Sequence, residues 1–236
     1  MLYLIICALN EEKALPQLLD DIAQIKKDLD MHVVFVDDGS TDNSLDIVKN
    51  RSGGLPVKII KNPENLGLGS SIRRALTLIC PDALETDFIA TMDADNTHSV
   101  CYLREMLAAA DKTSSDLVIA SRFITGGGES GVPCARKAIA NTARSLFRLR
   151  YGSINNIKDL TSGFRLYRAR CLCKILPELR SCGFAIQLEA LLKLSKKGAS
   201  AIELPFFLKY EKKQSKSRFS LIKSIKEYLP LIMGVG

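Results

Sequence analysis

The sequence predicts an α/β fold in which a mostly parallel central sheet is covered by helices on both faces. Short apolar runs alternate along the chain with stretches of helical periodicity. The apolar runs are continuous, which is typical of parallel strands buried on both faces. Polar motifs directly follow several of these runs, and ligands of such sheets bind beyond the carboxyl ends of the strands. The same observations therefore predict where the functional site lies.

Strands and helices alternate regularly in the first half of the chain. The strands are expected at Leu2–Ile6, Val33–Val36, Val57–Ile60, Phe88–Met92 and Leu117–Ala120. The helices are expected at Ala14–Leu29, Ser44–Arg51, Ser70–Ile79 and Cys101–Ala110. This order is typical of βαβ units that build a parallel sheet.

The pattern changes after Arg122. The glycine-rich segment Gly126–Gly131 predicts a flexible loop that acts as a lid or linker, because glycine escapes the usual φ restriction. The remaining elements are expected to be a basic helix at Ala135–Arg150, a turn and short strand within Asp159–Tyr167, a helix at Phe184–Leu194 and a strand at Ala199–Leu204.

The C-terminal segment predicts an amphipathic helix from Ser217 onward. Its apolar residues recur at spacings of three or four and share one face: Phe219, Ile222, Ile225, Leu229 and Ile232. We therefore divide the chain into a catalytic domain, residues 1–208, and a basic loop with an interfacial helix, residues 209–236.

Length and charge limit the possible functions. The chain has 236 residues, a formal net charge of +7 and a pI near 9.0. One large α/β domain, with or without a small appendage, fits this length. The positive charge favours phosphates, anionic lipid or nucleic acid as partners. Tryptophan is absent and aromatic residues are sparse, so stacking on nucleic acid is disfavoured, and no nucleic-acid recognition module is present.

The cysteines indicate reduced, buried thiols in a cytosolic protein. There are seven, an odd number, and they are scattered along the chain. Only Cys171 and Cys173 are close in sequence. A zinc site is not expected, since no second cysteine pair accompanies them.

Neither end of the sequence reads as a membrane span. Met1–Leu9 lacks a basic flank and predicts a first strand rather than a signal peptide. No run reaches the roughly 18 apolar residues that a transmembrane helix needs. The apolar stretch Leu229–Gly236 leaves open a continuation into a membrane segment in a longer chain.

An acidic pair follows the fourth apolar run and is the most informative motif. Asp93 and Asp95 come directly after Phe88–Met92, at the expected end of a strand. Carboxylate oxygens are the ligands that Mg²⁺ or Mn²⁺ prefers, and such sites leave positions open for substrate phosphates. The alternative is a turn with a helix N-cap, in which Asp is also common. His98 fits either a role beside the metal or a structural one.

Two further motifs follow strands or precede helices. In Asp37–Asp42, Asp38 is expected to accept hydrogen bonds from a base or a ribose, whereas Thr41 or Asp42 is expected to cap a helix. Asn65–Ser70 contains a GxG but lacks the third glycine of a dinucleotide fingerprint. A tight turn into a helix is the favoured interpretation.

Taken in order, these motifs resemble the family 2 glycosyltransferases of the GT-A fold. Within that family the sequence is most similar to the dolichyl-phosphate mannosyltransferase and polyprenyl-phosphate glycosyltransferase group. The resemblance covers almost the whole chain and implies a Rossmann-like sheet. The segments that carry it are Ala8–Glu11, Val36–Ser40, Asn65–Gly69, Met92–His98, Ser121–Phe123, Asp159–Arg165 and Ser217–Leu221.

The resemblance implies a binding site for a nucleotide-sugar donor. Its nucleotide-binding residues correspond to Cys7, Leu9, Glu11, Val36 and Asp38. Cys7 replaces a proline of the family and Leu9 replaces a tyrosine, which weakens stacking on the base.

The same resemblance implies the groups that hold phosphates. Asp93, Ala94 and Asp95 match the DxD element, which holds the metal and the donor's diphosphate. Arg122 matches an arginine near the transferred sugar and the acceptor phosphate, and Asp95 and Arg122 are the expected catalytic residues. The other expected acceptor-phosphate ligands are Arg136, Lys212 and Arg218.

The implied reaction is inverting, metal-dependent transfer of a sugar from GDP-mannose or a UDP-sugar to a polyprenyl or dolichyl phosphate. The acceptor oxygen is already anionic, so no strong general base is needed, and arginines orient it for attack. Seven Lys or Arg against one acid, Glu211, between Lys209 and Lys226 favour a position at the cytoplasmic face of a membrane.

Other functions remain open at this point. A nucleotidyltransferase is the nearest rival, but it needs a Gly-rich basic loop where Asn10–Lys13 stands. A non-catalytic, membrane-tethered subunit that binds a nucleotide sugar is another possibility. A glycosyltransferase with a non-lipid glycan acceptor in surface polysaccharide synthesis is the third.

Overall fold

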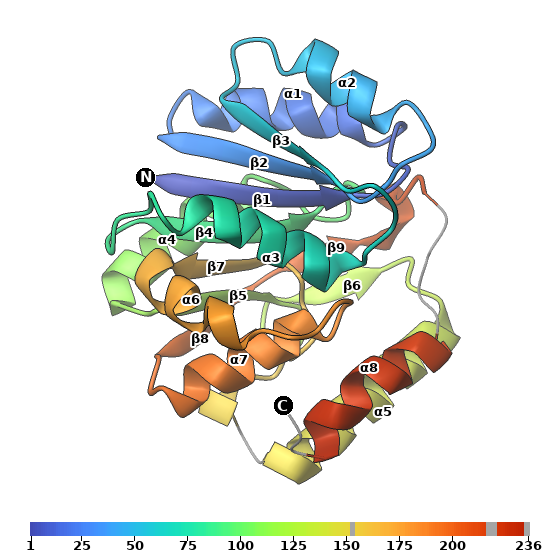
Figure 1. Ribbon diagram of the computed structural model, residues 1–236. Helices are drawn as coiled ribbons and strands as arrows, with labels where there is room; N and C mark the ends of the chain where they lie inside the picture. The colour runs from blue at the N-terminus through green and yellow to red at the C-terminus, as the bar shows by residue number, and fades with distance from the viewer. Residues whose placement is uncertain (152–153, 216–220, 234–236) are drawn as a thin grey trace.

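A seven-stranded sheet forms the centre of the molecule (Figure 1). The structure, a computed structural model, describes residues 1–151, 154–215 and 221–233. The strands follow the order β3-β2-β1-β4-β7-β5-β8, and all pairs are parallel except those of β7, which runs antiparallel to β4 and β5. The bounds are β1 Leu2–Ala8, β2 Met31–Asp37, β3 Val57–Lys61, β4 Phe88–Asp93, β5 Leu117–Ser121, β7 Arg165–Arg168 and β8 Ala201–Pro205.

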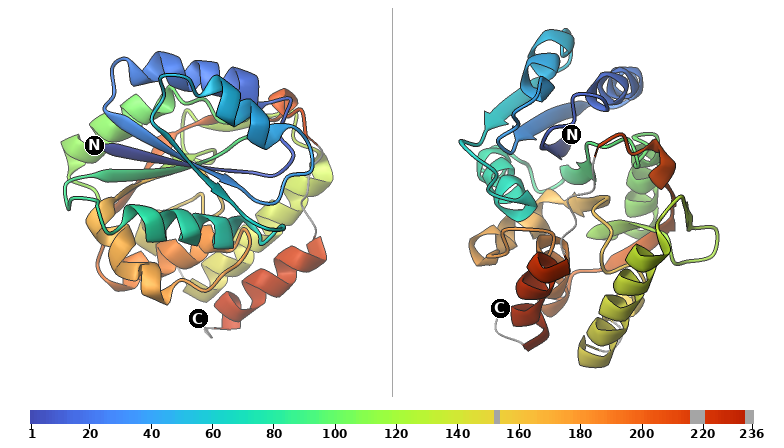
Figure 2. Two further views of the ribbon diagram at one scale, coloured as in Figure 1. Left: turned by 45° about the horizontal axis from the view of Figure 1, so that its top comes forward. Right: turned by 90° about the vertical axis from the view of Figure 1, so that its right-hand side faces the viewer.

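Helices cover both faces of the sheet, which makes a three-layered molecule (Figure 2). The helices α1, α2 and α4 pack on one face, and α3, α6 and α7 pack on the other. Their bounds are α1 Leu15–Lys26, α2 Ser44–Arg51, α3 Leu68–Ile79, α4 Tyr102–Thr113, α6 Ala169–Ile175 and α7 Ile186–Lys196. The mostly parallel α/β fold predicted from the sequence is confirmed.

Side-chain alternation along the strands builds two apolar cores. In β1, Leu4 and Ile6 belong to the core beneath α1 and α4, and Ile5 belongs to the opposite core beneath α3. All three are almost completely buried. This explains the continuous apolar runs, because neither face of the sheet is left to water.

Parts of the second half differ from the expectation. Within the glycine-rich segment, Gly128–Ser130 forms the strand β6, which pairs in parallel with β9, Phe207–Lys209. The segment is therefore not a free linker. The helix α6 was not expected. The domain boundary expected after residue 208 falls inside β9, and the division into two parts stays a prediction.

The expectation of reduced, buried cysteines is wrong for one disulfide-bonded pair and, as regards burial, for three exposed free thiols. Cys80, at the end of α3, and Cys173, on α6, form a disulfide with their Cα atoms 5.5 Å apart. The sequence suggested no such pairing, because 93 positions separate the two residues. Cys101, Cys134 and Cys182 are exposed free cysteines.

Two helices lie side by side at one edge of the molecule, α5 (Cys134–Tyr151) and α8 (Leu221–Met233) (Figures 1 and 2). The rings of Phe147 and Tyr228 meet edge to face with centroids 5.3 Å apart, and Tyr151 Oη donates to the carbonyl of Leu231. Leu231 is buried, whereas Leu229 is exposed. One side of α8 thus packs on the protein itself.

Part of the expected amphipathic face lies outside this description. Phe219 falls outside the described residues, whereas Ile232 is half-buried against the core. Among the helices described, none combines the length and the apolar character that crossing a bilayer requires.

Candidate active site

A cavity lies at the carboxyl end of the central strands, where β1 and β4 are neighbours. Cys7 of β1 is in register with Asp93 of β4 and with Val36 of β2, so the motifs after these strands reach one edge of the sheet. The chain leaves β1 toward β2 and later returns to β4 on its other side. This is the switch point at which parallel α/β sheets bind ligands.

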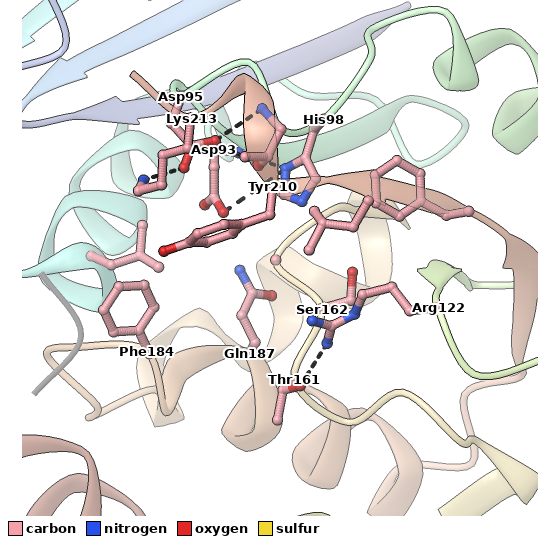
Figure 3. A pocket seen from close by; sticks show the side chains of 15 residues that line it. Asp93, Asp95, His98, Arg122, Thr161, Ser162, Phe184, Gln187, Tyr210 and Lys213 are labelled. Atoms are coloured by element: carbon pink, nitrogen blue, oxygen red, sulfur yellow. Dashed lines mark hydrogen bonds and ion pairs between the residues drawn. The ribbon is translucent and has the colours of Figure 1, made fainter. Parts of the chain in front are cut away.

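The acidic pair forms one wall of this cavity (Figure 3). Asp93, the last residue of β4, has a side chain that is 40% exposed. The Asp95 side chain is only 11% exposed and forms an ion pair with Nζ of Lys213. Its other oxygen, Oδ1, accepts hydrogen bonds from the Thr97 amide at 3.1 Å and the Thr97 hydroxyl at 2.6 Å.

Asp95 is held in its ionised form. Burial opposes ionisation, but the charge of Lys213 and the hydrogen bonds from Lys213 and Thr97 outweigh it and lower the pKa of Asp95. The ammonium group of Lys213 thus lies where a bound cation would neutralise the same carboxylate.

The residues present fit a divalent metal ion that is only partly held by protein. The ammonium of Lys213 on Asp95 is a stand-in for a cation, and Asp93 offers a second carboxylate on the same wall. No group of three or more His, Cys, Asp or Glu suited to a metal occurs in the described part of the chain. Mg²⁺ is commonly bound in this way, by one or two carboxylates plus substrate phosphates and water.

His98 has a structural environment. Its Nδ1 accepts a hydrogen bond from the backbone N–H of Asp93 at 3.2 Å. The imidazole stacks on Phe164 and meets Phe206 edge to face, with centroids 5.3 and 5.4 Å apart. Of the two roles that the sequence left open, the packing of this buried ring supports the structural one.

Arg122 stands on the opposite wall in a fixed orientation (Figure 3). Its Nε and Nη2 donate to the two oxygens of Asp159 at 2.8 and 2.9 Å, which is the bidentate geometry of a strong ion pair. Nη2 also donates to the Thr161 hydroxyl at 2.9 Å. Burial opposes the charge of Arg122, but Asp159 and then Glu129 raise its pKa, so the group stays a cation.

The loop that leads into β7 supplies this anchor. Asp159 is completely buried, and it accepts hydrogen bonds from the amides of Thr161 and Ser162 at 3.2 and 3.0 Å. Its own amide donates to Glu203 of β8 at 2.8 Å. The sequence predicted the turn but not that Asp159 would orient Arg122.

The expected nucleotide-binding residues lie along the ends of β1 and β2. Glu11 is buried, and its backbone N–H donates to the Ser44 hydroxyl at 2.7 Å. Cys7 and Leu9 are half-buried. Burial raises the pKa of the Cys7 thiol, and the nearby carboxylates of Asp38 and Asp93 raise it further, so Cys7 remains a neutral thiol.

Val36 can meet a base only through its backbone. Its side chain is completely buried in the core beneath α3, because position 36 of β2 points into the sheet's packed face. The side chain is therefore not available to a base, and the base contact expected of Val36 stays a prediction for its backbone.

Asp38 is largely engaged within the protein. Its Oδ1 accepts from the Asn62 amide at 2.7 Å and the Leu66 backbone at 3.0 Å, and its Oδ2 accepts from the Gly67 backbone at 3.0 Å. A carboxylate has about four acceptor positions. About one is therefore left for a nucleotide, and Asp38 also shapes the turn into α3.

The N-cap of the helix α2 lies one residue after Asp42, the nearer of the two positions predicted from the sequence. The N-cap position of α2 is Asn43, whereas Asp42 accepts from the backbone N–H of Ser44 at 2.9 Å. Asp42 thus stabilises the start of the helix from the position before the cap.

The basic residues expected to bind the acceptor phosphate lie in different parts of the chain. Lys212 is exposed, and the neighbouring Lys213 is the one that lines the cavity. Arg136 lies on α5, and Arg218 lies outside the described residues. The lysine of this segment that enters the cavity is Lys213, and the phosphate contacts expected of Lys212, Arg136 and Arg218 stay predictions.

Several cavity residues were not expected from the sequence. They are Thr161 and Ser162 of the loop before β7, Phe184 and Gln187 at the start of α7, and Tyr210 after β9. Only the motif Asp159–Arg165 had drawn attention to the first two.

Comparison with known proteins identifies the family of the chain. Residues 3–176 match the family described as Glycosyl transferase family 2. The chain is 32% identical over 202 residues to a dolichol-phosphate mannosyltransferase of Pyrococcus furiosus, covering 86% of this chain but only 54% of that protein. It is 31% identical over 217 residues to an undecaprenyl-phosphate mannosyltransferase of Micrococcus luteus, covering 90% of this chain and 85% of that one.

A solved structure confirms the fold. Glucosyl-3-phosphoglycerate synthase of Mycobacterium tuberculosis, in complex with Mn²⁺, UDP and glucosyl-3-phosphoglycerate, superposes with a TM-score of 0.67 at 16% identity. The match covers 100% of this chain and 81% of that chain. The same synthase was also crystallised with Mg²⁺ and UDP. The resemblance drawn from the motifs is thus confirmed, and the chain belongs to glycosyl transferase family 2.

Proposed function

We propose that the protein transfers a sugar from a nucleoside-diphosphate sugar, GDP-mannose or a UDP-sugar, to a polyprenyl or dolichyl phosphate. Two relatives, a dolichol-phosphate and an undecaprenyl-phosphate mannosyltransferase, support this acceptor and favour mannose. Since the chain spans 54% of the archaeal relative, the proposal concerns what these 236 residues can do.

The observation that carries the proposal is the pairing of opposite charges across one cavity. Asp93 and Asp95 form one wall, and Arg122 stands on the other. A diphosphate bridged by a divalent cation fits the acidic wall, and a second anion fits the guanidinium. A cavity with one acidic wall and one arginine opposite it supports a metal-bound nucleotide-sugar donor together with a phosphate acceptor.

The chemistry follows from these charges. An oxygen of the acceptor phosphate attacks the anomeric carbon, the bond to the donor's diphosphate breaks, and a single displacement inverts that carbon. Mg²⁺ or Mn²⁺, held by Asp93 and Asp95, would neutralise charge on the departing diphosphate. Arg122, fixed by Asp159, orients the acceptor phosphate without any proton transfer.

Lys213 is proposed to change partners when the donor binds. Its ammonium neutralises Asp95 before the metal arrives. Released from Asp95, it remains at the cavity, where a diphosphate offers new anionic oxygens.

We also propose that the protein lies on the cytoplasmic face of a membrane as a peripheral protein, attached through α5 and α8. Leu146 and Leu149 of α5 and Leu229 and Met233 of α8 are exposed apolar side chains. In the sequence, lysine and arginine residues lie close to these apolar positions in both helices. Apolar side chains beside cations are typical of interfacial helices.

A transfer assay tests the reaction. Purified protein is mixed with radiolabelled GDP-mannose or UDP-glucose, a short-chain polyprenyl phosphate, and Mg²⁺, Mn²⁺ or EDTA. Glycolipid is expected with one of the donors and should disappear in EDTA. Asp95→Asn should lose at least a hundredfold in turnover, on the order of 2.7 kcal/mol of transition-state stabilisation.

Matched controls make this result specific. Asp46→Asn changes an exposed carboxylate of α2 and should leave turnover unchanged. Product formed equally well by Asp95→Asn, or in EDTA, would refute the role of the acidic pair. No product from any donor in the presence of metal would refute the proposed function.

A further inference from the structure

Gln187 enters the floor of the cavity from the start of α7 (Figure 3). It lies between the acidic wall and the loop of Thr161 and Ser162, with Phe184 and Tyr210 nearby. The residue is 4% exposed. A buried amide at this position needs hydrogen-bond partners on both its oxygen and its nitrogen.

A completely buried arginine lies behind Gln187. Arg165 of β7 donates to the backbone carbonyl of Gln187 at 2.5 Å, to that of Ser162 at 2.8 Å and to that of Leu160 at 3.0 Å. A guanidinium only donates hydrogen bonds. Arg165 therefore ties the start of α7 to the loop before β7 and fixes the backbone of Gln187.

Tyr167 fixes the orientation of the side-chain amide. Its hydroxyl donates to Oε1 of Gln187 at 3.1 Å, and both residues are buried. Burial raises the pKa of Tyr167, although the nearby Arg165 opposes the change, so the hydroxyl keeps its proton. Because Oε1 accepts this bond, Nε2 is the end of the amide turned toward the cavity (Figure 3).

Among the described residues, no hydrogen bond from Nε2 of Gln187 is found, and this nitrogen faces the cavity (Figure 3). The cavity therefore receives a neutral N–H donor in a fixed position. Such a donor matches a ligand oxygen and rejects another donor. The charged groups Lys213 and Arg122 already serve anions, and the rings of Phe184 and Tyr210 offer apolar contact. Neutral donors among apolar groups are suited to a sugar, whose hydroxyls alternate with C–H faces.

We propose that Gln187 determines recognition of the donor's sugar, with its Nε2–H binding a sugar hydroxyl oxygen and Tyr167 acting as the positioning residue. This inference rests on the proposed function, because it needs a nucleotide-sugar donor in the cavity. It assigns the sugar end of that donor to the floor formed by α7 and the loop before β7.

Calorimetry on matched ligands tests the assignment. GDP-mannose and GDP, and in parallel UDP-glucose and UDP, are titrated in Mn²⁺ into the parent protein, Gln187→Leu and Gln187→Glu. Losing one neutral hydrogen bond should weaken the nucleotide sugar roughly three- to tenfold. Affinity for the free nucleotide diphosphate should stay unchanged. Gln187→Glu should weaken the nucleotide sugar at least as much, because a carboxylate has no N–H to donate.

Tyr167→Phe tests the positioning role. It keeps the ring and removes only the hydroxyl, so the amide can turn over within its site. The nucleotide sugar should weaken in the same sense but by less, with the affinity for free GDP or UDP unchanged. Gln17→Leu, on the exposed side of α1, is the control and should match the parent. Circular dichroism melting establishes that each variant is folded.

The outcomes separate the two proposals. An equal loss for GDP-mannose and GDP would place Gln187 at the diphosphate and overturn the sugar assignment. Unchanged affinities in Gln187→Leu would overturn it as well. If the folded parent protein binds neither nucleotide sugar, the proposed function itself fails and takes this inference with it.

Discussion

At the scale of single residues, the ion pair between Asp95 and Lys213 has a measurable consequence for metal binding. The ammonium of Lys213 competes with a metal for the same carboxylate. Lys213→Met removes the charge and keeps most of the side-chain length. The variant should bind Mn²⁺ roughly tenfold more tightly without any nucleotide, since a charge-assisted hydrogen bond is worth about 1.5–3 kcal/mol.

Free Mn²⁺ measured by electron paramagnetic resonance checks this prediction. Lys212→Met is the matched control, because Lys212 is the adjacent lysine and is exposed. An affinity that is lower or unchanged in Lys213→Met would show that Lys213 does not occupy the cation position.

The anchor of Arg122 predicts a pH-dependent stability. Asp159→Asn leaves a buried guanidinium without its bidentate partner and should cost about 3–5 kcal/mol of unfolding free energy at pH 7. Burial would raise the pKa of Asp159, but Arg122 and the loop amides lower it below the unfolded value of about 3.9. The stabilisation is therefore complete above the unfolded pKa and is lost as the pH falls through the folded pKa.

Urea denaturation of both proteins at several pH values measures this difference. The gap between parent and Asp159→Asn should be constant above about pH 5 and shrink below about pH 4. Asp111→Asn, an exposed carboxylate on α4, is the control and should show little change at pH 7. A gap that widens on acidification would contradict the assignment.

The individual site residues show what a sequence can reveal. Asp93 and Asp95 were predictable, because a local pattern, an apolar strand followed by two carboxylates, places them at the sheet edge. Val36 was assigned from a motif alone, and its burial depends on which face of the sheet it meets. The choice between Lys212 and Lys213 depends on the short turn after β9, which leaves only the second lysine facing the cavity.

At the scale of elements, the start of α3 depends on close contact with the loop before α7. A Cβ added at Gly69 would lie 2.2 Å from the carbonyl oxygen of Ser181. Gly67 has a φ of +90°, and its added Cβ would meet the carbonyl oxygen of Cys182 at 2.6 Å. The glycines of this GxG thus permit two segments of backbone to pack together, in agreement with the expected turn into a helix.

Gly69→Ala should therefore destabilise the protein despite alanine's higher helix propensity. The backbone of the 181–182 loop must move, which costs roughly 1–3 kcal/mol. Gly53→Ala is the control, because nothing lies within 4 Å of its added Cβ. Thermal melting should show a lower midpoint for Gly69→Ala alone, and equal midpoints would refute the close contact.

Elements that depend on distant partners were the ones the sequence missed. The strands β1, β2 and β4 carry apolar runs that identify them locally. The strand β6 has only three residues, Gly128–Ser130, and exists because β9 lies beside it. The disulfide between Cys80 and Cys173 likewise requires α3 and α6 to be neighbours, which periodicity does not reveal.

At the scale of the whole molecule, the exposed apolar residues of α5 and α8 predict membrane attachment. Leu149 is 86% exposed and Leu229 is 48% exposed, so replacing them should not disturb the fold. Leu149→Glu combined with Leu229→Glu should weaken binding to anionic vesicles, because charged groups resist burial at the acyl boundary. Flotation with liposomes that contain phosphatidylglycerol measures the effect.

Leu84→Glu is the control, since Leu84 is an exposed leucine in the turn before β4. It should float like the parent protein. Salt should weaken the electrostatic part of binding within a screening length of about 8–10 Å and leave the apolar part. Unaltered flotation of the double variant would exclude these two leucines as the attachment surface.

The reversed direction of β7 has a consequence for how the acidic wall and the floor of the cavity are built. The segments that follow β1, β2 and β4 reach the cavity from the carboxyl ends of these strands. Because β7 runs in the opposite direction, its first residue lies at the same edge of the sheet, and the segment that reaches the cavity is the one before it. Thr91 of β4 donates to the carbonyl of Gly163 at 2.8 Å and joins the acidic wall to the floor. The acidic wall thus follows its strand, whereas the floor loop precedes its own. Positions of this loop other than Asp159, which anchors Arg122, can therefore change while the acidic wall keeps its anchorage, so the same donor half can be combined with different floors.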